Sequence, residues 1–211
     1  MIYRNKEQLI RSCIHKTDVV LDVGFWGQGI THEEENWPHT ILKKNAQEVY
    51  GIDVDLRNSF LNDPHYIQSS AEDFYFPVKF DVIFAGDLIE HLSNPGLFLE
   101  SCRRNLKEDG RLVLTTPNTF NLFNITEKIT KNEPTVNSDH TCYFNSKTLR
   151  TLLRKNNFLL KEVNYIYSLE IDFKESLKKK ILNILYSLLS HVTDKFIETL
   201  VIVAVVSDDK K

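Results

Sequence analysis

Two carboxylates and a group of glycines stand where a parallel sheet could hold a cofactor. Asp22 interrupts an apolar run, and three glycines follow it at positions 24, 27 and 29. A buried carboxylate requires a donor or a cation, and glycine lets the backbone turn sharply and approach a ligand. Asp53 ends a second apolar run, and the two runs are expected to be neighbouring strands of a doubly wound sheet. Asp53 would then lie beside the glycine loop, where an acid can accept both hydroxyls of a ribose.

The spacing of these glycines separates two kinds of cofactor. A dinucleotide site requires Gly-x-Gly-x-x-Gly with a helix that starts inside the motif, so that the helix N-terminus meets a pyrophosphate. The pattern here is Gly-x-x-Gly-x-Gly, and the next helix is predicted to start later, with Asn36 as its cap and Pro38 in its first turn. S-adenosylmethionine carries an ammonium group and no phosphate, so it fits this pattern better than NAD.

A second group of reactive side chains follows another predicted strand. Asp87, Glu90 and His91 are three and four residues apart, so a helical turn would place them on one face. His140 lies after a variable segment and could return to the same site. If S-adenosylmethionine is the cofactor, the reaction expected of its sulfonium is an in-line methyl transfer, which needs alignment and, for a hydroxyl acceptor, a base. We predict Glu90, His91 and His140 as the catalytic residues.

Apolar runs alternate with helical patterns along the chain, which predicts an α/β fold with a mainly parallel sheet. The predicted strands are residues 18–23, 48–55, 65–69, 80–86, 111–116, 158–167 and 200–206. The predicted helices are residues 4–15, 36–45, 94–107, 146–157 and 174–192. Ser146 is expected to cap its helix, and a turn at residues 108–110 is expected to end the helix before it. The last strand is expected to run antiparallel, at or near an edge.

Three segments are expected to build the acceptor pocket. The long loop at residues 30–38 is a suspected pocket wall, and it leaves Trp26, His32 and Trp37 without an assigned role. Residues 118–143 have weak periodicity, which predicts a functional loop or lid. The basic amphipathic helix at 174–192 could lie on a membrane surface, but we favour packing on the domain, over the substrate mouth or in a homodimer.

Length and composition limit the class of protein. At 211 residues the chain is expected to form a single domain, residues 1–211. A net charge of −3 argues against generic nucleic-acid binding, so no DNA partner is expected. Three widely spaced cysteines without metal-ligand spacing predict reduced thiols in a cytoplasmic protein. The N-terminus has no apolar signal core and no run approaches ~20 apolar residues, so we expect no transmembrane span.

Five stretches in the same order resemble the motifs of class I S-adenosylmethionine-dependent methyltransferases. They are residues 20–29, 49–53, 70–74, 80–92 and 106–118. The resemblance implies a Rossmann-like three-layer sandwich with a seven-stranded sheet, and S-adenosyl-L-methionine as cofactor. It assigns cofactor contacts to Asp22, Gly24, Phe25, Gly27, Gly29, Asp53, Val54, Ser70, Ala71, Glu72, Ala85, Gly86 and Asp87. Within this set, Asp53 would hold the ribose, residues 70–72 the adenine edge, and residues 85–86 the methionine ammonium, with help from Asp22.

Two branches of this family share the Glu90-His91 pair. Ubiquinone-pathway O-methyltransferases resemble it there, and the enzymes that 2′-O-methylate small-RNA 3′ ends also resemble it at Thr116-Pro117-Asn118 and at a distal histidine. The second branch binds a divalent metal, and Asp87, Glu90, His91 and His140 match its ligand types. We do not favour a metal here, because Glu-His-Leu is frequent in metal-free members.

The resulting hypothesis is a methyltransferase that acts on a small or medium polar acceptor. A hydroxyl of a sugar, a glycan precursor or another metabolite is the leading choice, and it rests on the resemblance. One alternative is a divalent-metal-dependent O-methyltransferase acting on a ribose 2′-OH or a catechol. A second alternative is a non-catalytic partner subunit that keeps the cofactor-binding fold.

Overall fold

The computed structural model describes residues 1–26, 35–56, 60, 62–131, 133–167, 186, 193 and 196–207. Its strands are β1 (Ile2–Tyr3), β2 (Val19–Val23), β3 (Glu48–Asp53), β4 (Tyr66–Gln68), β5 (Phe80–Gly86), β6 (Leu106–Pro117), β7 (Phe158–Ile166) and β8 (Thr199–Val206). Its helices are α1 (Lys6–Cys13), α2 (Pro38–Asn45), α3 (Pro95–Asn105), α4 (Leu122–Lys131) and α5 (Ser146–Lys155), with the short 3-10 helix η1 (Ile89–His91).

All of these strands join one sheet in the order β1-β7-β8-β6-β5-β2-β3-β4. The pairs are parallel except those of β8, which runs antiparallel to both β6 and β7. The predicted α/β fold and its antiparallel last strand are therefore confirmed. The described residues form one strand more than the seven predicted, the two-residue β1, which pairs with β7.

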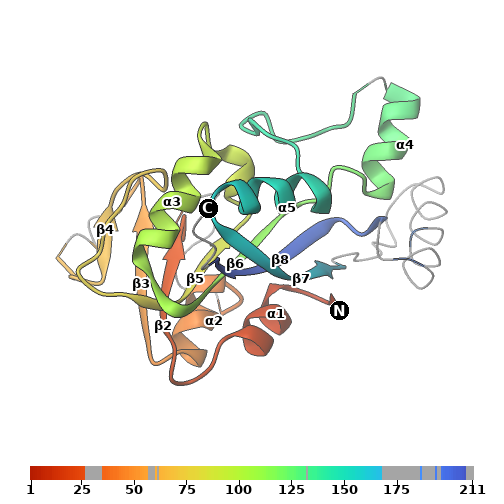
Figure 1. Cartoon of the computed structure of the whole chain (residues 1–211). Helices are drawn as coiled ribbons and strands as arrows, with labels where there is room; N and C mark the ends of the chain where they lie inside the picture. The colour runs from red at the N-terminus through yellow and green to blue at the C-terminus, as the bar shows by residue number, and fades with distance from the viewer. Residues whose placement is uncertain are drawn as a thin grey trace.

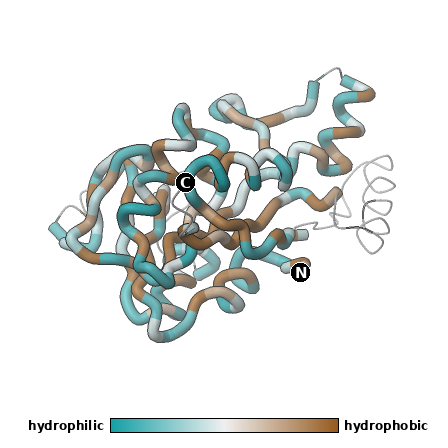
Figure 2. The backbone as a smooth tube through the Cα atoms, in the orientation of Figure 1, coloured by the Kyte–Doolittle hydropathy of each residue, from teal (hydrophilic) through white to brown (hydrophobic). Residues whose placement is uncertain are grey.

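Helices cover both faces of the sheet, with α1 and α2 on one side and α3 and α5 on the other (Figure 1). Because side chains alternate across a strand, β2 supplies Val20 to the α1 and α2 side and Leu21 to the opposite side. Apolar burial of this kind is the main stabilising contribution to the fold. Figure 2 shows the contrast between interior and surface, with hydrophobic residues along β8 and polar residues on the outer turns.

The strand order reverses at β2, which lies between β3 and β5. Chains leaving the carboxyl ends of β2 and β5 therefore go to opposite sides and open a crevice between them. In open α/β sheets, ligands bind in such a crevice. The fold thus places Asp22, Asp53 and the residues after β5 around one position.

Three predicted helix ends differ from the structure. The N-cap of α2 is Trp37 and not Asn36, and its side chain makes no capping bond. The N-cap of α5 is Asn145 and not Ser146, because the Asn145 carboxamide accepts two backbone N–H groups. Helix α3 ends at Asn105, since β6 already begins at Leu106, before the expected turn at residues 108–110.

Residues 118–143 contain a helix, α4, where the sequence predicted a loop or lid. The predicted helix at 174–192 lies almost entirely outside the described residues, as do Gly27, Gly29 and His32. Among the residues that the structure describes, none of the helices combines the length and apolar character that a membrane crossing would need.

Candidate functional site

A cavity of about 400 Å³ lies at the carboxyl ends of β2, β3 and β5. Its size is within the range of small-molecule and cofactor sites. Its walls include the predicted cofactor residues Asp22, Gly24, Phe25, Asp53, Val54, Ser70, Ala71, Gly86 and Asp87, together with the predicted catalytic residue His91. Residues distributed over five separate stretches of sequence therefore surround one space.

Gly24 makes the turn by which the chain leaves β2. Its φ is +72°, a region that disfavours side chains, and its N–H donates to the Ile52 carbonyl of β3 at 2.8 Å. A Cβ at this position would lie 2.9 Å from Leu88 Cδ1. The glycine is therefore needed both for the turn and for the close approach of the segment after β5.

The Asp53 carboxylate is fixed at the end of β3 by backbone amides. Its Oδ2 accepts from Trp26 N–H at 2.9 Å and its Oδ1 accepts from Asp55 N–H at 3.1 Å. Burial raises the pKa of this carboxyl, and the backbone amides of Asp55, Trp26 and Val54 oppose that change. A carboxylate offers about four acceptor sites, so about two remain for ligand hydroxyls.

Aromatic side chains form the wall of the cavity that follows Gly24. Trp26 and Trp37 both line the cavity, and their rings lie edge to face with centroids 5.7 Å apart. The Trp37 indole N–H donates to the Phe25 carbonyl at 3.1 Å, which ties the start of α2 to the end of β2. These two tryptophans had no predicted role, and the structure places both at the cofactor-sized cavity. Residues 27–34 between them lie outside the described residues, so the acceptor-pocket wall expected of the loop at residues 30–38 stays a prediction.

Asp87 does not join Glu90 and His91 on one helical face as expected. Its φ is +51°, and only the three residues after Leu88 form a helical turn, η1. The Asp87 carboxylate instead pairs with Lys6 Nζ at 2.7 Å and accepts from Thr115 Oγ1 at 2.7 Å. Sequence reasoning missed Lys6, a cation of α1 that reaches the cavity from 81 positions away, and no local pattern marks it.

Two predicted cofactor residues lie outside the cavity wall. Ala85 is buried within β5. The Glu72 carboxylate accepts from the backbone N–H of Asn94 at 2.8 Å and from its side chain at 3.0 Å, just before α3. That position suits an anchor for the start of α3.

The predicted catalytic residues come together at the far side of the cavity. One ligand atom from each of Glu90, His91 and His140 lies within 4.8 Å of the others. The Glu90 carbonyl accepts from the backbone N–H groups of Thr141 and Cys142, which brings the His140 segment to η1. The two imidazole rings are 4.6 Å apart and nearly perpendicular.

Glu90 is the most deeply buried member of this cluster, with 2% of its surface exposed. Its Oε2 accepts from Thr116 Oγ1 at 2.8 Å, whereas Oε1 has no hydrogen-bond partner among the described residues. Burial raises the pKa of Glu90 to about 7. Burial also lowers the pKa of His140, and the neighbouring His91 acts in the same direction.

A second, smaller cavity of about 190 Å³ adjoins this cluster. Glu90 and His140 line it, along with three asparagines, Asn121, Asn124 and Asn137. An apolar hollow of about 340 Å³ on α4 shares Thr119, Asn124 and Tyr143 with it. The Glu90, His91 and His140 cluster therefore separates the cofactor-sized cavity from this second one. We call the second one the polar cavity after its asparagine and threonine side chains, although apolar atoms contribute more of its surface.

The family model described as a methyltransferase domain matches residues 15–163. The chain belongs to the methyltransferase domain family. This bears out the class I family expected from the motifs, and with it S-adenosylmethionine as the cofactor. The match includes both carboxylates and the residues after β5.

Individual relatives agree with this family. A ubiquinone biosynthesis O-methyltransferase of Actinobacillus pleuropneumoniae is 32% identical over 81 residues, which cover 38% of this chain and 32% of that protein. The mitochondrial ubiquinone biosynthesis O-methyltransferase of Schizosaccharomyces pombe is 30% identical over 103 residues, covering 46% and 37%. The methyltransferase thus matches only about a third of the length of these curated relatives.

Solved structures agree in fold at low sequence identity. The S-adenosylmethionine-dependent methyltransferase of Archaeoglobus fulgidus has a TM-score of 0.60 at 14% identity and covers 96% of each chain. At this identity the likeness extends to the Rossmann-like architecture and not to the acceptor.

Proposed function

We propose that this methyltransferase moves the methyl group of S-adenosylmethionine to a hydroxyl of a small or medium polar acceptor, with sugar-like acceptors first. The observation that carries the proposal is the position of the predicted catalytic cluster. His91 lines the larger cavity, whereas Glu90 and His140 line the smaller polar one. A reacting pair bound in the two cavities would meet at this cluster.

The side chains of the cluster suit proton removal from a hydroxyl. S-adenosylmethionine supplies an electrophilic methyl on a sulfonium, and the acceptor oxygen must lie in line with the breaking bond. We assign His140 or Glu90 as the base, because both face the polar cavity. Thr116 orients the Glu90 carboxylate through its hydroxyl, so Thr116 would be a positioning residue.

In the larger cavity, we assign the ribose to Asp53 and the methionine ammonium to Asp22 and the chain after β5. Asp53 retains acceptor sites after its two amide bonds. Residues 118–143 would belong to the same domain as the cofactor site, because they supply most of the polar cavity wall.

The chemistry of the polar cavity supports an acceptor with several hydroxyls. Three carboxamides and the Thr119 and Thr135 side chains line it. Several of these groups already bond within the protein, and their remaining donor and acceptor sites, such as those of the Asn137 and Asn124 carboxamides, would meet the acceptor. The apolar hollow beside it could hold an apolar part of the same acceptor. The ubiquinone-pathway relatives make a hydroxylated ring a second acceptor to include.

The test is transfer of a trideuteromethyl group from labelled S-adenosylmethionine to a panel of sugars, nucleotide sugars, catechols and ribonucleosides. Mass spectrometry should detect an O-methylated product from at least one hydroxylated acceptor, and this product should be lost in whichever variant removes the base, His140→Ala or Glu90→Gln. Binding of S-adenosylhomocysteine without methylation of any acceptor would contradict the proposed reaction. Methylation on nitrogen would contradict the O-methyl assignment.

A metal-dependent reaction is a second candidate, favoured by one specific observation. Glu90, His91 and His140 present a carboxylate and two imidazoles within 4.8 Å, and Glu90 Oε1 is buried without a partner among the described groups. These three residues would hold a divalent cation, which would supply Lewis acidity toward an acceptor oxygen. Asp87, the fourth ligand that the resemblance implied, is held by Lys6 and Thr115.

Chelation separates the two candidates. If the reaction uses a metal, EDTA abolishes methyl transfer, Mn²⁺ or Mg²⁺ restores it, and Mn²⁺ raises the melting temperature of the wild type but not of His140→Ala. Unchanged activity in EDTA, with no Mn²⁺-dependent melting shift, would refute the metal-dependent candidate.

A further inference from the structure

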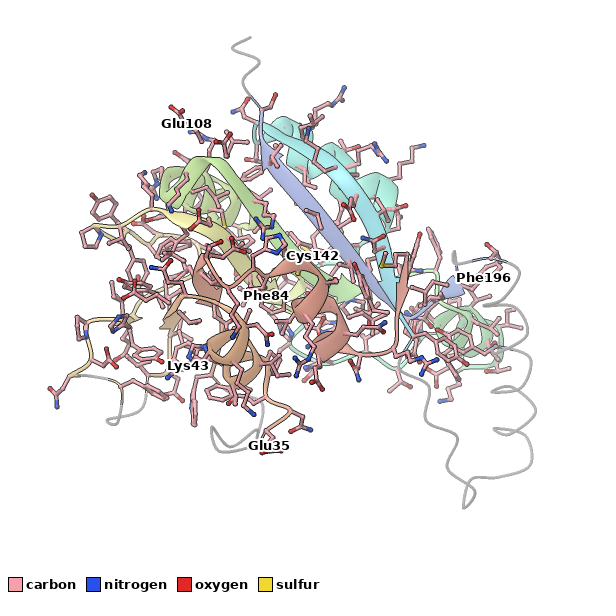
Figure 3. The ribbon with its side chains drawn as sticks, turned by 90° about the horizontal axis from the view of Figure 1, so that it is seen from below. Glu35, Lys43, Phe84, Glu108, Cys142 and Phe196 are labelled. Atoms are coloured by element: carbon pink, nitrogen blue, oxygen red, sulfur yellow. The ribbon has the colours of Figure 1, made fainter. Side chains whose placement is uncertain are left out.

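A chain of hydrogen bonds leads from the cofactor-sized cavity through the protein to its surface. Asp22 lines the cavity, and its Oδ2 lies 2.9 Å from His39 Nδ1. His39 Nε2 lies 3.0 Å from the Tyr66 hydroxyl, which also accepts from Lys43 Nζ at 3.2 Å. Lys43 is exposed on α2, at the far side of the molecule from β7 and β8 (Figure 3). Sequence reasoning gave neither His39 nor Tyr66 a role.

The following arrangement of protons satisfies every hydrogen bond in this chain. Lys43 can only donate, so the Tyr66 oxygen accepts from it and the Tyr66 O–H is free to donate to His39 Nε2. His39 then carries its proton on Nδ1 and donates it to the Asp22 carboxylate. Each group then meets its partner, with His39 Nδ1 as the donor to Asp22.

The imidazole has no room to turn. His39 is 1% exposed, and the rings of Phe25, Trp37 and Tyr66 lie within 5.6 Å of it, centre to centre. Its backbone belongs to the first turn of α2, immediately after Pro38. A donor held this firmly fixes the orientation of the carboxylate that it meets.

The other oxygen of Asp22 is available to a ligand. Asp22 Oδ1 has no hydrogen-bond partner among the described residues, although the side chain is almost fully buried in the cavity wall. A buried carboxylate is stable only where donors or a cation meet it. The predicted occupant of this part of the cavity brings such a cation, the ammonium of its methionine portion.

We propose that His39 is a positioning residue for cofactor binding. It holds the Asp22 carboxylate so that Oδ1 faces the methionine ammonium, and Tyr66 fixes the tautomer that makes His39 a donor. The inference rests on the proposed function, because it takes the larger cavity as the S-adenosylmethionine site. The effect of His39 is expected to be selective, because a group that acts through Asp22 changes binding of the amino-acid portion of the cofactor and not of its adenosine.

A matched pair of amide substitutions isolates the His39 donor. In His39→Asn the amide nitrogen reaches the place of Nδ1, so the bond to Asp22 is kept. In His39→Gln the amide reaches the place of Nε2, so that bond is lost. A hydrogen bond to a charged group contributes about 1.5 kcal/mol, which corresponds to ~10-fold in affinity.

Isothermal titration with two ligands tests the proposal. S-adenosylhomocysteine carries the ammonium, whereas methylthioadenosine has the same adenosine and thioether without the amino acid. For S-adenosylhomocysteine, His39→Gln and Tyr66→Phe should weaken binding, the former by ~10-fold, while His39→Asn stays within ~2-fold of the wild type. For methylthioadenosine, all three variants should match the wild type.

Three outcomes would overturn this role. Equal losses for both ligands, or equal losses in His39→Asn and His39→Gln, would mean that His39 only packs the wall. Wild-type affinity in His39→Gln would mean that Asp22 needs no donor. If the wild-type protein binds neither ligand, the larger cavity is not the cofactor site. This failure is distinct from failure of the His39 role, because it appears in the wild type before any substitution is made.

Discussion

Replacement of Asp53 by alanine should weaken cofactor binding by ~100-fold. The Asp53 carboxylate accepts one hydrogen bond from Trp26 N–H and one from Asp55 N–H, at 2.9 and 3.1 Å. About four acceptor sites minus these two leaves two for the ribose hydroxyls. At about 1.5 kcal/mol for each charge-assisted bond, the lost free energy of binding is about 3 kcal/mol.

Asp55→Ala is the matched control for this substitution. Asp55 is exposed, does not line the cavity, and meets Asp53 through its backbone N–H, which alanine keeps. Both variants remove one carboxylate from the same segment, so a general electrostatic effect would appear in both. We expect Asp55→Ala to bind S-adenosylhomocysteine within ~3-fold of the wild type.

The assay is isothermal titration with S-adenosylhomocysteine and with methylthioadenosine, at a temperature where thermal melting shows both variants folded. Because both ligands carry the ribose, Asp53→Ala should weaken both, unlike the substitutions of His39. Unchanged affinity in Asp53→Ala, or the same loss in Asp55→Ala, would refute the placement of the ribose.

Three further substitutions test other parts of the structure. Gly24→Ala should lower the free energy of unfolding in urea by about 1–2 kcal/mol, because an alanine would be forced to positive φ beside Leu88; an unchanged midpoint would contradict the turn. Asn145→Ala should lower the free energy of unfolding by about 1 kcal/mol, since the capping box of α5 is lost, and Asn145→Ser should retain most of that stability. Glu90→Gln should lower the methyl-transfer turnover by ~100-fold or more while S-adenosylhomocysteine affinity stays unchanged; full turnover would exclude Glu90 from the chemistry.

The sheet was predictable because its signals are local. Residues 80–86 form an apolar stretch that only Asp81 interrupts, and β5 has the predicted bounds. The adjacency of β2 and β3 follows from a doubly wound sheet, and the meeting of Asp22 and Asp53 at one edge follows from that adjacency. The last strand was expected at or near an edge, and it lies between β7 and β6. These inferences require only the chain direction and the burial of apolar faces.

The helix ends were less predictable because distant groups decide them. Asn105 ends α3 while its carboxamide is buried, accepting from Phe76 N–H and donating to the Phe74 carbonyl. Trp37 starts α2 without a side-chain cap, because an indole N–H can only donate, and its bond to the Phe25 carbonyl holds it at this place. No window of sequence around these residues contains their partners.

In the candidate site, too, local patterns were predictable and contacts between distant residues were not. Glu90, His91 and His140 were grouped by residue type and do lie together, whereas Asp87 left the group because Lys6 and Thr115 hold it. Lys6, His39 and Tyr66 were missed, since each meets its partner through the tertiary fold. A buried histidine near an apolar helix face carries no sequence signal that distinguishes packing from positioning.

The most direct test of the account is a crystal structure of the methyltransferase with S-adenosylhomocysteine. The account predicts that the ribose hydroxyls meet Asp53, that the ammonium meets Asp22 Oδ1, and that the sulfur faces His91 at the boundary with the polar cavity. A ligand bound elsewhere, or one whose ribose turns away from Asp53, would contradict it.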